Sequence, residues 1–200
     1  MEAPTHQQFN ALINDNIKAV ESARGLTADI IKGAVVMASS LNAGGKILIC
    51  GNGGSAADSL HFSGELLNKF LIVRRPLAAI SLAADVSTLT SIGNDEAYDV
   101  VFSKQVEALA REQDVLVVIT TSGNSASILR AAEAAQQQNI KVIALNGRDG
   151  GALSNLLGDN DIDIVVPQEK TARIQEVHGI IIHAFCQFID QQLFGENKYE

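Results

Sequence analysis

Apolar residues follow a helical period in the first part of the chain. Residues 5–23 place five apolar side chains on one stripe of a helix: Phe9, Leu12, Ile13, Ile17 and Val20. The pattern predicts a second helix over residues 27–41, with Thr27 as a candidate N-cap and residues 42–45 closing it. A helical pair this apolar can form a subunit contact or pack on its own domain, and the sequence leaves both open.

From residue 46 onward the chain alternates between short apolar runs and helical patterns. Runs that are almost continuously apolar, such as VLVVIT and KVIAL, are typical of parallel strands buried on both faces. Strands are predicted at residues 46–50, 78–82, 114–120, 141–146 and 162–166. Helices are predicted at residues 55–69, 86–93, 98–111, 125–138, 150–157 and 172–193. This alternation predicts an α/β fold with a five-stranded parallel sheet flanked by helices.

Length and composition predict one globular domain. The 200 residues are 46% hydrophobic and 19% charged, which is enough apolar sequence to bury a core. We expect a single domain over residues 1–200, in which a helical pair (1–44) precedes an α/β core with a C-terminal helix (45–200). The formal net charge of −8 argues against broad nucleic-acid binding through a basic face. The short basic turn Arg74-Arg75-Pro76 is expected to be solvated rather than functional.

Other features of the sequence bear on its cellular setting. No apolar run of 18 residues predicts a membrane span, and the first residues lack the basic and then apolar pattern of a signal peptide. The two cysteines, Cys50 and Cys186, stand in apolar contexts typical of buried, reduced thiols. We therefore expect a cytoplasmic protein whose partners include neither nucleic acid nor a membrane.

Two glycine- and serine-rich turns are candidate anion sites. Residues 51–55 (GNGGS) separate a predicted strand from a predicted helix, and residues 120–125 (TTSGNS) do the same further along. Glycine permits close backbone approach, and a helix start presents free N–H groups that suit a phosphate without Lys or Arg. Since ligands bind beyond the carboxyl ends of parallel strands, we expect both turns to face one crevice. Taken alone, each turn could be an ordinary helix cap.

The same turns argue against two nucleotide-binding classes. Their spacing does not match GxxxxGK[ST] and no lysine follows, which disfavours a nucleotide triphosphatase. The glycines at positions 51, 53 and 54 do not give GxGxxG, because residue 56 is alanine, so a dinucleotide fold is also disfavoured.

Candidate acid–base and metal-binding residues lie on two predicted helices. His61 and Glu65 are four residues apart and share a helix face; both types bind divalent metals, and Glu also moves protons. The last predicted helix adds Gln175, Glu176, His178 and His183. Spacing alone favours Glu176 as the partner of His183, although Gln175 can still converge with it. Structural hydrogen bonds, a surface His–Glu pair or a metal would each account for these residues.

Six segments taken together resemble the bacterial phosphoheptose isomerases of the sugar isomerase (SIS) fold group. They occur in order and span nearly the whole chain: CGNGGSAAD, HFSGEL, SIGND, TTSGNS, NGRDGG and TARIQEVHGIIIH. The resemblance implies a three-layer α-β-α sandwich of the flavodoxin-like SIS type. It also implies conversion of D-sedoheptulose 7-phosphate to D-glycero-D-manno-heptose 7-phosphate through an enediol, the first step towards ADP-heptose and the lipopolysaccharide core.

The resemblance further implies which residues form the site. Glu65 would be the base and His183 the acid, and one zinc ion per subunit would be held by His61, Glu65, Gln175 and His183, so that Gln175 replaces Glu176. Substrate contacts would come from Asn52, Gly53, Gly54, Ser55, Glu65, Asn94, Asp95, Thr120, Thr121, Ser122, Ser125 and Gln175. Family members are homotetramers with active sites at subunit contacts, which would account for the apolar N-terminal helices and last helix.

Two positions depart from the family pattern. Thr120 stands where many relatives carry Ser, and Ala172 stands where some carry Asp. Alanine also occurs at the latter position in a sister protein that associates with the replication initiator DnaA, so a DnaA-associating replication-initiation regulator is the alternative function. That sister typically lacks the glutamate that this chain keeps as Glu65, which favours the enzyme. A SIS module that only senses a sugar phosphate is a third possibility.

Overall fold

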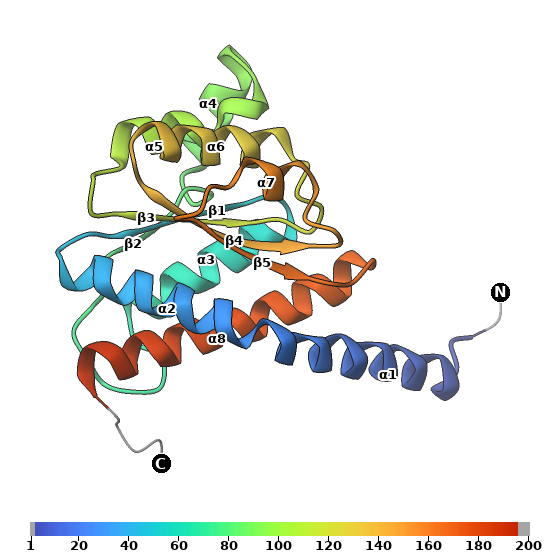
Figure 1. Ribbon diagram of the computed structural model, residues 1–200. Coiled ribbons are helices and arrows are strands. Elements are labelled where there is room, and N and C mark those ends of the chain that lie inside the picture. Colours follow the sequence, from blue (N-terminus) through green and yellow to red (C-terminus); the bar gives the residue numbers. More distant parts are fainter. Residues whose placement is uncertain (1–2, 196–200) are drawn as a thin grey trace.

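A five-stranded parallel sheet forms the middle layer of the protein (Figure 1). The computed structural model describes residues 3–195. The strands are β1 (Ile47–Gly51), β2 (Ala79–Ser81), β3 (Val115–Ile119), β4 (Lys141–Gly147) and β5 (Ile162–Val166). All five predicted strands are confirmed. They lie in the order β2-β1-β3-β4-β5, which is the flavodoxin-like order.

Helices cover both faces of the sheet and complete the predicted three-layer sandwich (Figure 1). One face carries α2 (Thr27–Asn42), α3 (Gly54–Leu67) and α8 (Thr171–Phe194). The other face carries α5 (Ser103–Leu109), α6 (Ala126–Gln137) and α7 (Gly151–Leu156), and α4 (Val86–Asp95) lies beyond them. The first helix, α1 (His6–Ser22), packs along α8. None of the helices in residues 3–195 combines the length and hydropathy needed to cross a bilayer.

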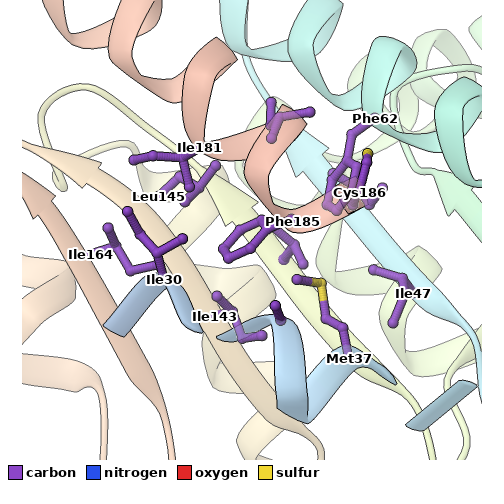
Figure 2. Close-up of a cluster of buried hydrophobic side chains, with 14 of the residues drawn as sticks. Ile30, Met37, Ile47, Phe62, Ile143, Leu145, Ile164, Ile181, Phe185 and Cys186 are labelled. Carbon is purple, nitrogen blue, oxygen red and sulfur yellow. The ribbon is translucent and has the colours of Figure 1, made fainter. Parts of the chain in front are cut away.

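The core divides into two clusters because successive strand residues point to opposite faces of the sheet. Ile47 and Phe185 belong to the cluster between the sheet and helices α2, α3 and α8, part of which Figure 2 shows. Leu48 and Cys50 belong to the cluster on the side of α5 and α6. Cys50 and Cys186 are both free and buried, as predicted, and burial raises the pKa of each thiol.

Two local predictions were wrong. The helix predicted at residues 98–111 is a 3-10 turn, η2 (Tyr98–Val100), followed by the shorter α5, which ends before residue 111 because Ala110 adopts extended backbone. Thr27 is the first residue of α2 rather than its N-cap. A 3-10 turn, η1 (Ala23–Leu26), joins α1 directly to α2, and the Thr27 hydroxyl donates to the Arg24 carbonyl.

Candidate functional site

The turns after β1 and β3 lie next to each other at the carboxyl edge of the sheet. These two strands pair in parallel as far as Gly51 and Ile119. The side chain of Asn52 in the first turn donates from Nδ2 to the Ser127 hydroxyl at the start of α6, at 2.9 Å. This is the point where the strand order reverses, and ligands of open α/β sheets bind at such points.

Close packing fixes the backbone of the first turn. Gly53 has a φ of +56°, a conformation that L side chains rarely adopt. A Cβ atom on Gly51 would lie 2.4 Å from the Ser55 carbonyl oxygen, so only glycine fits there. A Cβ atom on Gly54 would lie 2.5 Å from Nε2 of Gln175, which shows that the Gln175 carboxamide of α8 covers the start of α3.

The second turn packs closely against the loop after β4 and is hydrogen-bonded to it. Gly123 has a φ of +64°, and a Cβ atom there would lie 1.9 Å from the Gly150 carbonyl oxygen. The buried Thr120 hydroxyl accepts a hydrogen bond from the Gly123 amide at 3.3 Å. Asn124 spans the two loops, because its side chain accepts from the Ala152 amide at 2.9 Å. The buried Thr120 hydroxyl therefore stabilises the conformation of the turn through a hydrogen bond inside it.

The remaining hydroxyls of this turn are better placed for a ligand. Thr121, Ser122 and Ser125 are partly exposed. Ser125 stands at the N-cap of α6, yet its side chain makes no capping hydrogen bond. The ordinary helix-cap interpretation therefore does not account for the Ser125 hydroxyl.

The segment just after α4 contacts the first turn. Asn94 and Asp95, at the carboxyl end of α4, are exposed and share a hydrogen bond of 2.8 Å. Tyr98, just after them, donates its hydroxyl to Oδ1 of Asn52 at 2.8 Å. Both ends of the Asn52 carboxamide are thus engaged by protein groups. Sequence reasoning missed Tyr98, for which the only signal was its position after the SIGND segment.

A second polar cluster forms further along α3. His61 Nε2 lies 3.2 Å from Oε1 of Glu65, and the His61 ring meets the His183 ring of α8 edge-on, with centroids 5.1 Å apart. The side chains of His61 and Glu65 are 44% and 26% exposed, so solvent and ligands reach them. The packing of α3 on α8 therefore brings together three of the residues singled out from the sequence.

Phe70, in the loop after α3, stacks on the ring of His183. The two ring centroids lie 5.4 Å apart and the planes are 20° from parallel. This stacking contact restrains the orientation of the His183 imidazole. No sequence pattern predicted this contact, because an aromatic residue after a helix is an ordinary core candidate.

His178, the remaining histidine candidate on α8, has a structural role. It is fully buried and its Nε2 lies 2.9 Å from the Asn146 carbonyl oxygen, so Nε2 carries the proton. Burial lowers the pKa of His178 to about 4, against a smaller opposing effect of this hydrogen bond. The imidazole is thus neutral near pH 7 and anchors the end of β4 under the second turn.

The candidate zinc ligands fit zinc by donor type but do not converge fully within one chain. Two imidazoles and a carboxylate are common zinc donors. Gln175, however, lies at Gly54, about two turns of α3 before His61. Glu176, the partner favoured by spacing, instead pairs with Arg173 and accepts from Asn16 of α1 at 2.6 Å. Within residues 3–195, no three His, Cys, Asp or Glu side chains alone form a group that could hold a metal ion.

Comparisons with known proteins agree with this architecture. The sheet with polar turns after β1 and β3 defines a SIS domain, and the SIS domain family model matches residues 8–147. Phosphoheptose isomerase of Shewanella loihica is 50% identical over 178 residues, covering 89% of this chain and 90% of the relative.

Solved structures give the same result. The phosphoheptose isomerase of Francisella tularensis has a TM-score of 0.91 at 45% identity and covers 94% of this chain and 100% of that chain. The phosphoheptose isomerase GmhA of Neisseria gonorrhoeae has a TM-score of 0.88 at 47% identity and covers 92% of this chain and 98% of that chain. The chain belongs to the phosphoheptose isomerase family, as its six segments predicted.

Proposed function

We propose that the protein isomerises D-sedoheptulose 7-phosphate to D-glycero-D-manno-heptose 7-phosphate. The observation that carries this proposal is the assembly of His61, Glu65 and His183 on the same helix pair whose starts border the two polar turns. The identity to phosphoheptose isomerases over most of the chain supports the substrate. The test is incubation of the purified protein with the ketose phosphate and detection of the aldose phosphate by NMR. Binding without turnover would instead indicate a sugar-phosphate sensor.

Proton transfer between two neighbouring carbons accounts for the residue types. The Glu65 carboxylate takes a proton from C1 of the ketose, and the C2 carbonyl oxygen accepts a proton from His183, which gives a 1,2-enediol. Return of a proton to C2 and loss of the O1 proton then leave the C1 aldehyde. The reaction neither gains nor loses protons overall, so the same two side chains can serve in both halves.

We propose that zinc binds at His61, Glu65, Gln175 and His183. When bound, zinc would polarise the carbonyl and hydroxyl oxygens of the sugar. Purified protein is expected to hold near-stoichiometric zinc, measured by elemental analysis, and His61→Ala or His183→Ala should lose most of it. Full activity of a protein without any metal would contradict this assignment. Arg130→Ala, on the exposed surface of α6, serves as the matched control and should keep its zinc.

The partly exposed hydroxyls of the second turn are proposed to hold the phosphate. Ser122→Ala or Ser125→Ala is expected to raise KM by roughly tenfold or more and to lower kcat much less, because these groups bind the end of the substrate that does not react. Steady-state kinetics over a range of ketose phosphate concentrations measures both constants. A loss confined to kcat would assign these serines to the chemical step instead.

We propose a homotetramer in which neighbouring subunits complete each site. Apolar side chains that are 43% to 63% exposed gather on α1 and beside the acid–base cluster on α3 and α8: Phe9, Leu12, Ile13, Ile17, Leu60, Leu67 and Ile180. Surfaces this apolar are typical of protein contacts. The offset of Gln175 from His61 within one chain also supports a site that another subunit completes.

We place the reaction in the cytoplasm, as the step that supplies heptose phosphate for the lipopolysaccharide core. The naming of the similar proteins as phosphoheptose isomerases supports this placement. No observation favours the DnaA-associating regulator, since the acid–base cluster that a scaffold would not need is assembled here.

A further inference from the structure

The basic turn after α3 is not the solvated loop that the sequence predicted. The Arg74 side chain is 1% exposed, and its Nε donates to Oδ1 of Asp190 at 2.6 Å. The Asp190 side chain is also 1% exposed and stands on α8, about two turns after His183. Burial raises the pKa of Asp190, and Arg74 opposes that rise. A buried ion pair is weak evidence for stability by itself, so the other contacts of Arg74 are informative.

Arg74 uses its remaining N–H groups to cap the end of α3. Nη2 donates to the Glu65 carbonyl oxygen at 2.9 Å, and Nη1 donates to the Leu66 carbonyl oxygen at 2.9 Å. A weaker bond of 3.3 Å reaches the Asn68 carbonyl oxygen. The last carbonyls of a helix lack partners within it, and a positive charge is favourable at this end. The guanidinium therefore forms hydrogen bonds with the helical turn that carries Glu65.

The loop from α3 to β2 thus touches both halves of the acid–base pair. Arg74 holds the backbone of Glu65 and ties it to α8 through Asp190. Phe70, in the same loop, stacks on the ring of His183. We propose that Arg74 is a positioning residue that sets the Glu65 carboxylate against His183 for proton transfer. This inference rests on the proposed isomerase function, in which Glu65 is the base.

A substitution to lysine separates positioning from simple charge pairing. Arg74→Lys keeps a positive charge for Asp190, but a single ammonium group cannot bond Asp190 and two carbonyls as the planar guanidinium does. We expect kcat per mole of folded enzyme to fall by about tenfold or more, because small misplacements of reacting groups are costly. KM should stay within about twofold, because the phosphate-binding turns are untouched.

A second variant covers the case in which Arg74→Lys does not fold. Arg74→Met combined with Asp190→Leu removes both charges and leaves no buried charge unpaired, a change that proteins often tolerate. The same loss of kcat is expected. The matched control is Asp114→Asn, which breaks the ion pair between Lys46 and the buried Asp114 at the amino ends of β1 and β3. This control is expected to lose thermal stability but to keep kcat within about twofold.

The outcomes distinguish this inference from the proposed function. If folded Arg74→Lys or the double variant keeps wild-type kcat while the wild-type protein turns over the ketose phosphate, the positioning role is overturned and the isomerase stands. If Arg74→Lys loses only melting temperature, as Asp114→Asn should, the residue is structural and the inference is wrong. If the wild-type protein forms no aldose phosphate, the proposed function fails and the inference fails with it.

Discussion

Glu65→Gln is expected to lower kcat by roughly 10²–10⁴-fold without unfolding the protein. Glutamine has nearly the shape of glutamate, and the Glu65 side chain is partly exposed, so packing should be retained. What is lost is the carboxylate that accepts the substrate proton, and general base catalysis contributes a factor of this size. Steady-state kinetics gives kcat, and circular dichroism with a thermal melt checks the fold.

The chain offers a matched control for this variant. Glu133 also lies on a helix and pairs with an arginine, Arg130, but it is on the outer face of α6, away from both polar turns. Glu133→Gln should keep wild-type kcat. A folded Glu65→Gln enzyme that turns over as fast as this control would rule out Glu65 as the base.

The protein is expected to lose about 3 kcal/mol of stability between pH 7 and pH 4 through His178 alone. Burial lowers the pKa of this imidazole from 6.5 to about 4 in the folded state. Between these values the unfolded chain binds a proton that the folded chain does not. The contribution of His178 to the free energy of unfolding is therefore fully present above pH 6.5 and is lost as the pH falls towards 4. Each unit of difference between the folded and unfolded pKa values corresponds to about 1.4 kcal/mol of that free energy.

Urea unfolding at pH 7 and pH 4 measures this effect when His178→Gln is compared with the wild-type protein. The glutamine amide can still donate to the Asn146 carbonyl oxygen but does not titrate. The partly buried Asp163 and the buried Asp190 have raised pKa values, which act in the opposite direction. Both proteins contain these carboxyls, so their effect on the pH dependence of stability cancels when the two proteins are compared. Equal pH dependence in the two proteins would show that His178 is not buried as a neutral group.

The sheet, and the carboxyl edge at which a ligand is expected to bind, were predictable because the sequence signals for them are local. Short apolar runs predicted the strands, almost continuous ones in the case of β3 and β4, and the alternation of strands and helices predicted a parallel sheet. The adjacency of the two polar turns followed, since parallel strands end at the same edge. These inferences do not depend on which face of each helix meets its neighbours or on which loops are buried.

The remaining features depend on tertiary packing. Helical spacing could not decide between Gln175 and Glu176, because it does not show which face of α8 meets α3. Arg74 looked solvated because its partners, the Glu65 carbonyl and Asp190, are distant in sequence or belong to the backbone. The local pattern of charged residues does not predict such contacts.

Isomerisation of a seven-carbon ketose phosphate by this chain requires that a proton move between C1 and C2. The most direct measurement is NMR of D-sedoheptulose 7-phosphate incubated with the zinc-supplied protein in deuterium oxide. We expect aldose 7-phosphate that carries solvent deuterium at C2, and almost none of this product with Glu65→Gln. Unchanged ketose in the presence of folded wild-type protein would contradict this expectation.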